Sequence, residues 1–183
     1  MTRRALEGLR IEAPSSATRA RRMTRLTRYG IFINGLFPCL RRIVDGWVPG
    51  MLGSEKEFRN SLFDHLRRSL PPDCRIEKEY RDGGTTCDLY LKWPGRLAPT
   101  EVFFELKHNL KRKTDFDRLV GQIHGLEPSK RKIIVVLCGA TDEALLGRLN
   151  ELFKNQLNDE SVFDVFDLLH ERNLRIIRKV DLY

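Results

Sequence analysis

A glutamate and a lysine interrupt an apolar segment near the middle of the chain. In FFELK (103–107), Glu105 and Lys107 lie two residues apart, which is one period of a β-strand, so both side chains leave the same face. Phe104 and Leu106 leave the opposite face. A charged pair on such a strand is either a solvated surface or a functional site, and the residues around it decide between the two.

Asp88 lies on the preceding apolar segment and supplies a partner for Glu105. If residues 85–93 and 100–107 form an antiparallel hairpin that turns within WPGRLAP, Asp88 faces Glu105 with the two Cβ atoms about 4.5–5.5 Å apart. Two carboxylates this close repel each other unless a proton or a cation lies between them. The divalent cations Mg²⁺ and Mn²⁺ prefer oxygen ligands of this type.

Lys107 would lie beside such a metal, because it is one strand period beyond Glu105. Its ammonium could orient an attacking water or help to deprotonate it, while the metal offsets the charge that builds on a phosphate. The pattern therefore favours metal-assisted hydrolysis of a phosphodiester. The alternative is a cluster of surface charges that contributes roughly a few tenths of a kcal/mol to stability.

The order of these residues resembles the PD-(D/E)xK superfamily of restriction-endonuclease-like nucleases. The pattern Asp88-x16-Glu105-x-Lys107 follows a segment with acidic residues and precedes a segment with Gln122. The resemblance covers roughly residues 54–140 and departs from the family pattern at Cys87, where proline is usual. It implies a three-layer α/β sandwich with a central mixed β-sheet flanked by helices.

The resemblance also implies one or two Mg²⁺ ions, with Mn²⁺ as a substitute, bound by Asp88, Glu105 and the backbone carbonyl of Leu106. An acid on the preceding helix often joins the site in this family. Glu55 is favoured for that role because it lies on the inward face of the expected helix, whereas Glu57 has a capping role with the preceding serine.

Other candidate contacts follow the ExK strand. Gln122 is expected on a helix, where its amide would touch the substrate backbone or a water in the site; the alternative is a surface glutamine. Lys111, Arg112 and Lys113 form a basic run just beyond the strand. They are either phosphate contacts or a solvated basic face.

Most of the net charge of +8 lies at the start of the chain. Residues 1–50 hold ten Lys and Arg against three acids, a net charge of +7, and include Arg21, Arg22 and Arg25. A basic arm on a near-neutral domain indicates a polyanionic partner, with DNA first, RNA as an option and an acidic membrane surface second. The alternative is a solvated terminus without a partner.

The remaining composition is that of a cytoplasmic protein. Four scattered cysteines without a CxxC pair are typical of reduced thiols. The longest apolar candidate, residues 29–40, has 12 uncharged residues. A membrane span needs about 20, so we expect no stable membrane insertion.

The expected elements must position the charged residues. We expect a flexible basic arm at 1–22, a helical or apolar extension at 23–53 and a nuclease domain at 54–183. The order of elements predicts an α/β sandwich around a mixed sheet. The elements are helices at 54–70, 114–126 and 141–156, strands at 75–80, 85–93, 100–107 and 132–139, and a short helix after residue 161 followed by a strand at 174–180.

The sequence therefore favours a Mg²⁺-dependent endonuclease acting on DNA, of the junction-resolving, restriction or repair type. A homodimer is one option, because a duplex has two strands to cut. One alternative is a catalytically inactive protein of nuclease fold that only binds nucleic acid. Another is a membrane-surface or partner-binding protein that uses residues 24–50, with Phe37 and Trp47 as anchors.

Overall fold

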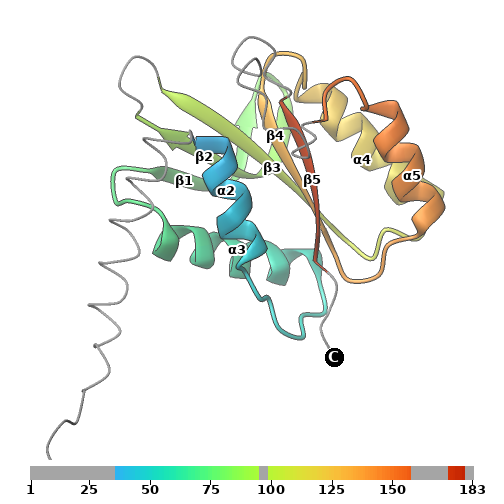
Figure 1. Ribbon diagram of the computed structural model, residues 1–183, viewed down its shortest axis with the longest axis horizontal. Helices are drawn as coiled ribbons and strands as arrows, with labels where there is room; N and C mark the ends of the chain where they lie inside the picture. Colours follow the sequence, from blue (N-terminus) through green and yellow to red (C-terminus); the bar gives the residue numbers. More distant parts are fainter. Residues whose placement is uncertain (1–35, 95–98, 158–172, 180–183) are drawn as a thin grey trace, which may run out of the picture.

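Five strands form one mixed sheet in the computed structural model, which describes residues 36–94, 99–157 and 173–179 (Figure 1). The sheet order is β1-β2-β3-β4-β5; β1, β2 and β3 are antiparallel, whereas β3, β4 and β5 are parallel. The strands span Arg75–Asp82 (β1), Thr85–Trp93 (β2), Thr100–His108 (β3), Lys132–Cys138 (β4) and Leu174–Lys179 (β5). The predicted arm at 1–22, with Arg21 and Arg22, lies outside the described residues, as do Arg25 and the short helix after residue 161.

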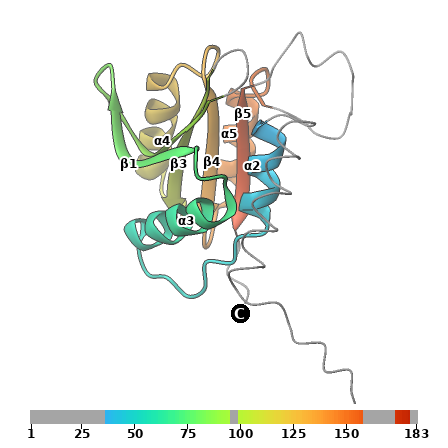
Figure 2. The ribbon, with the colours of Figure 1, turned by 90° about the vertical axis from the view of Figure 1, so that its left-hand side faces the viewer.

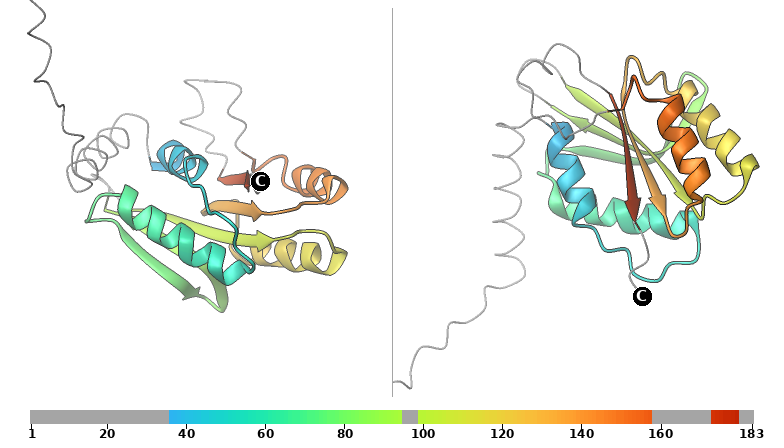
Figure 3. Two further views of the ribbon diagram at one scale, coloured as in Figure 1. Left: turned by 90° about the horizontal axis from the view of Figure 1, so that it is seen from below. Right: turned by 45° about the vertical axis from the view of Figure 1, so that its right-hand side comes forward.

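Helices cover both faces of the sheet, as Figure 2 shows. Those on one face are α2 (Leu36–Asp45) and α3 (Glu55–Ser69), and those on the other are α4 (Lys113–Gly125) and α5 (Glu143–Leu152). On the first face α3 packs against β1, β2 and β3, and α2 packs against β5 and α3 (Figure 3). The predicted three-layer α/β sandwich with a mixed sheet is confirmed.

Two hydrophobic cores result, one on each side of the sheet. Side chains of β3 alternate between them: Phe104 and Leu106 enter the core under α2 and α3, and Phe103 enters the core under α4 and α5. After Lys132, β4 is apolar and buried on both faces, as expected of a central parallel strand. Between β1 and β2, Gly83 and Gly84 both adopt positive φ, which a two-residue hairpin turn of type I′ requires.

Helix α3 begins at a well-formed N-cap. Ser54 Oγ accepts a hydrogen bond from the Glu57 amide at 3.3 Å, and the Glu57 carboxylate accepts one from the Gly53 amide at 2.9 Å. The predicted capping role of Glu57 is confirmed, although its carboxylate reaches back to Gly53 rather than to the Ser54 amide. These bonds satisfy amides that the helix itself leaves unpaired.

Phe37 and Trp47 are core residues, so the hypothesis that they anchor the protein to a membrane or partner surface is wrong. Both side chains are buried in the core under α2 and α3, and Trp47 Nε1 donates to Ser61 Oγ at 3.1 Å. The sequence left open whether this segment packs on the domain or contacts a partner, and α2 packs on the domain. Among the described residues, no helix is long and apolar enough to cross a membrane.

The cap of α3 yields a first prediction. Ser54→Ala removes the acceptor for the Glu57 amide and should lower the free energy of unfolding by about 1 kcal/mol. Urea denaturation monitored by circular dichroism measures this change. Lys56→Ala, at an exposed position of the same turn, is the control and should leave the free energy of unfolding within roughly 0.5 kcal/mol of wild type. Equal midpoints for all three proteins would contradict the cap.

Candidate functional site

The β2–β3 ladder stops partway along both strands and leaves a fork in the sheet. Paired positions run from Trp93 opposite Thr100 to Leu89 opposite Phe104, which is the register that the sequence predicts. Beyond Leu89, the start of β2 is paired with β1; beyond Phe104, the end of β3 is paired with β4. Asp88 and Glu105 are the next two positions, so the predicted carboxylate pair lies where the two strands separate.

Asp88 caps the open edge of β3 at this fork. Its Oδ2 accepts a hydrogen bond at 2.8 Å from the Leu106 amide, an N–H that the ladder would otherwise have paired. The Asp88 side chain is only 11% exposed. This bond fixes Asp88 beside the ELK segment of β3.

Glu105 is completely buried beside Asp88, with a relative exposure of 0%. Neither of its carboxylate oxygens receives a hydrogen bond from any N–H or O–H group in the described part of the chain. Burial first, and then the negative charge of Asp88, raise the pKa of Glu105 to about 8 despite the opposing effect of Lys107. Near neutral pH this carboxyl group therefore keeps its proton, and a cation bound at the same place would displace that proton.

Lys107 and Glu55 meet at the same place from two different elements. Lys107 Nζ lies 3.3 Å from both carboxylate oxygens of Glu55, which is the first residue of α3. The lysine is nearly buried, whereas the glutamate is partly exposed. Glu57 is held in the helix cap, and its hydrogen bond from the Gly53 amide lowers its pKa. Of the two candidate acids on α3, the structure thus brings Glu55 to Lys107.

Arg59 also enters the site and was missed by the sequence analysis. Its Nη1 lies 3.2 Å from Asp88 Oδ1, and its Nη2 lies 2.7 Å from Glu79 Oε1. Its place four residues after Glu55 on the same helix could have revealed it, because residues at this spacing share a helix face. Its partner Asp88, 29 positions away in sequence, could not be foreseen.

The other predicted contacts lie on α4 or just before it. Gln122 lies on α4, and its buried Oε1 has no hydrogen-bond partner among the described residues, so it is not the surface glutamine considered above. The basic run is exposed at the start of α4. There Arg112 pairs with Asp115 at 2.8 Å and Lys113 with Asp117 at 2.5 Å.

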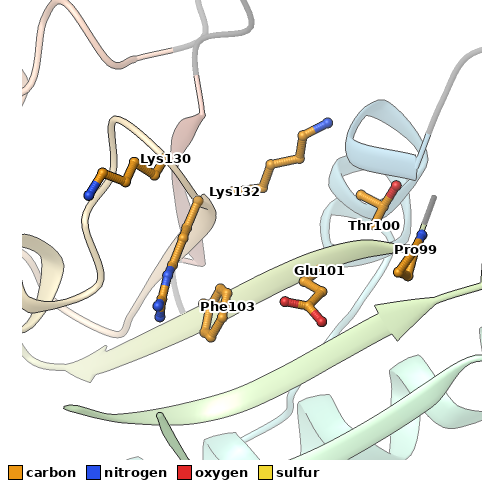
Figure 4. A pocket seen from close by; sticks show the side chains of 7 residues that line it. Pro99, Thr100, Glu101, Phe103, Lys130 and Lys132 are labelled. Atoms are coloured by element: carbon orange, nitrogen blue, oxygen red, sulfur yellow. The ribbon is translucent and has the colours of Figure 1, made fainter. Parts of the chain in front are cut away.

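An open hollow of about 470 Å³ lies at the opposite end of β3 from the fork, and Figure 4 shows it. Its charged residues already have partners: Arg131 pairs with Asp82 at 2.6 Å, and Glu101 pairs with Lys92 at 2.9 Å. The hollow shares no residue with the carboxylate site. It is lined by Pro99, Thr100, Glu101, Phe103, Lys130, Arg131 and Lys132.

The acceptors at the fork are oxygen atoms, which hard divalent cations prefer as ligands. Across 36–94, 99–157 and 173–179, no cluster of three or more His, Cys, Asp and Glu side chains is arranged to hold a metal. Two carboxylates and the carbonyl of Leu106 would instead form an oxygen-only set. The unpaired buried oxygens of Glu105 fit such a cation, because a positive charge offsets their burial and their repulsion by Asp88.

No family model matches the sequence, and no curated protein matches it. The structure is similar to that of Pyrococcus furiosus SfsA in complex with Ca²⁺, with 18% sequence identity and a TM-score of 0.35. The match covers 69% of this chain and 54% of that one, so the chain spans about half of its length. A similarity at this level carries no argument about function.

The raised pKa of Glu105 predicts a pH-dependent stability without metal. The buried carboxyl stays protonated up to about pH 8, whereas in the unfolded chain it ionises near the ordinary value of 4.5. Unfolding then releases a proton between these values, so the free energy of unfolding falls as pH rises, by at most about 1.4 kcal/mol per unit. Urea denaturation in EDTA at pH 5, 6, 7 and 8 measures this fall.

Glu105→Gln should lack this contribution, because an amide does not titrate. Its stability relative to wild type should therefore increase steadily from pH 5 to pH 8. Glu101→Gln is the control: the hydrogen bond from Lys92 lowers the pKa of Glu101, so its contribution changes only below pH 4.5. Parallel profiles for Glu105→Gln and wild type would contradict the raised pKa.

Proposed function

We propose that this protein is a Mg²⁺-dependent nuclease of the PD-(D/E)xK type that hydrolyses phosphodiester bonds, with DNA as its substrate. The observation that carries this proposal is Glu105, a fully buried carboxylate without a donor, beside Asp88 at the fork of the sheet. A protein gains no stability from such a pair. It suits a site that takes up a cation.

Asp88, Glu105 and the backbone carbonyl of Leu106 would hold the ion. When bound, Mg²⁺ or Mn²⁺ supplies Lewis-acid activation of water and neutralises charge on the phosphate. The amide of Leu106 fixes Asp88 at 2.8 Å, and Phe104 and Leu106 anchor the strand in the core. The ligands are therefore held by regular structure rather than by a loop, which favours a constant geometry.

Lys107 and Glu55 provide the groups for proton transfer and orientation. The Lys107 ammonium donates to the attacking water or to a phosphate oxygen, and its ion pair with Glu55 holds it in place. As the water oxygen bonds to phosphorus and the bond to the leaving oxygen breaks, the partly exposed Glu55 carboxylate accepts the proton of the water. Glu55 could alternatively support the metal directly.

Loss of cleavage in site variants is the principal test. Asp88→Asn, Glu105→Gln and Lys107→Met should each lower the cleavage rate at least about 100-fold, because each removes a group that acts on the developing charge. The assay uses labelled duplex, four-way junction, flap, single-strand and RNA substrates with Mg²⁺, Mn²⁺ or EDTA. EDTA should abolish cleavage by the wild-type protein.

The matched control for these variants lies in the same hairpin. Glu101→Gln alters a carboxylate that lies four residues before Glu105 on β3. Its ion-pair partner Lys92 lies directly opposite on β2. This variant should cut at the wild-type rate. Wild-type cleavage by Asp88→Asn or by Lys107→Met would rule out this mechanism.

Binding of nucleic acid should depend on the basic arm. Arg21, Arg22 and Arg25 would contact phosphates and release counterions, while Arg112 and Lys113 are partly neutralised by acids of their own helix. Replacing Arg21, Arg22 and Arg25 together by Gln should weaken DNA binding and lower the slope of log K against log salt by up to about 2.7. Fluorescence anisotropy between 50 and 200 mM salt in EDTA measures both the affinity and the slope. An unchanged slope would show that these arginines do not contact phosphates.

One observation favours a second candidate, a nuclease-fold protein that binds nucleic acid without cutting it. Arg59 already neutralises Asp88, as a permanent counterion would in an inactive site. Such a protein would retard DNA equally in EDTA and in Mg²⁺ and leave every substrate of the panel intact.

A further inference from the structure

We infer that Arg59 is a positioning residue that controls metal entry: it neutralises Asp88 in the metal-free protein and shifts onto Glu79 when a divalent cation binds. This inference rests on the proposed function, since it takes the fork as the metal site. It concerns residues outside the PD-(D/E)xK pattern. Neither Arg59 nor Glu79 belongs to the proposed ligand set.

The guanidinium of Arg59 is shared between two carboxylates. One terminal nitrogen contacts Asp88 at 3.2 Å and the other contacts Glu79 at 2.7 Å. The arginine is 14% exposed, and its Nε is buried without an acceptor in the described part of the chain. It therefore depends on these two carboxylates for its charge compensation.

The two carboxylates differ in how much they need the arginine. Asp88 is 11% exposed and stands beside buried Glu105, whereas Glu79 is 64% exposed and in contact with water. Water already stabilises the charge of Glu79, so the contact between Glu79 and the Arg59 guanidinium can become closer or looser with little change in free energy. Asp88 needs a cation beside it, which is the Arg59 guanidinium in the metal-free protein. A divalent metal ion could replace that guanidinium.

The backbone places Glu79 for this role. In the β1–β2 ladder Lys78 pairs with Leu89 and Tyr80 with Cys87, so Glu79 and Asp88 form the position that the ladder skips. Glu79 adopts a φ of +52° there, an uncommon conformation for a residue with a side chain. Both carboxylates that contact Arg59 thus lie at the one unpaired position within the described β1–β2 ladder. Strained backbone of this kind is often retained at functional sites.

Competition follows from the charges. Arginine stays protonated in proteins, so its charge cannot be removed and can only be moved. A divalent cation on Asp88 would repel a guanidinium held on the same carboxylate. Glu79 offers that guanidinium a partner further from the metal. A purely structural ion pair would behave differently, because losing it would reduce stability without improving metal binding.

Direct measurement of Mn²⁺ binding tests this inference. The full-length protein without nucleic acid is titrated with Mn²⁺ by calorimetry and by electron paramagnetic resonance. Arg59→Gln should bind Mn²⁺ at least about 10-fold more tightly than wild type, because the competing charge is gone. Arg67→Gln removes an exposed arginine from the same helix and should bind as wild type does.

Two further variants separate competition from a general change in charge. Arg59→Lys keeps the charge but cannot span both carboxylates, so its Mn²⁺ affinity should lie between those of wild type and Arg59→Gln. It also serves if Arg59→Gln fails to fold. Glu79→Gln removes one of the two carboxylates that contact Arg59, so that Asp88 is its remaining partner and Mn²⁺ binding should weaken. In the double variant with Arg59→Gln this effect of Glu79→Gln should largely vanish.

The outcomes distinguish this inference from the proposed function. If Asp88→Asn abolishes Mn²⁺ binding but Arg59→Gln and Arg59→Lys bind no more tightly than wild type, the inference is overturned and the metal site stands. If no protein of the set binds Mn²⁺, both are overturned. Two results together support the inference. Arg59→Gln binds Mn²⁺ more tightly than wild type, and this binding is lost when Asp88 is also replaced. Glu79→Gln weakens Mn²⁺ binding in the protein that has Arg59 but not in the Arg59→Gln variant.

Discussion

The burial of Glu105 beside Asp88, at the point where β2 and β3 separate, is the interaction on which the rest of the site depends. Two negative charges that share a water-poor position are unfavourable unless a proton or a cation compensates them. The cores on both faces of the sheet hold them there: Phe104 and Leu106 bury one side of β3, and Val135 lies next to Glu105 on β4. A proton on Glu105 supplies this compensation up to about pH 8.

Helix α3 organises the charges that surround this pair. Its cap at Ser54 fixes where the helix begins, and its apolar stripe, which includes Phe58, fixes which face is buried. One turn then presents Glu55 to Lys107 and Arg59 to Asp88. The helix supplies an anion for the lysine of β3 and a cation for the aspartate of β2, so a single rigid element balances both sides of the fork.

The distribution of the remaining charge complements this arrangement. Several exposed basic residues of the described chain are paired with acids close in sequence, as Arg112 is with Asp115 and Lys130 with Glu127. Such pairs are worth little in stability, but they reduce the positive potential of the surface. Residues 1–50 carry +7 of the net charge of +8.

Sequence alone determined what depends on local periodicity. The alternation of β3, the register that sets Asp88 next to Glu105, and the capping role of Glu57 follow from two-residue and three-residue spacings. Only the tertiary structure decided which charges are buried and which residues from distant segments meet. Arg59 reaches Asp88 across 29 positions, and Lys107 reaches Glu55 across 52. Phe37 and Trp47 entered the core for the same reason: burial depends on packing between elements, which no local pattern encodes.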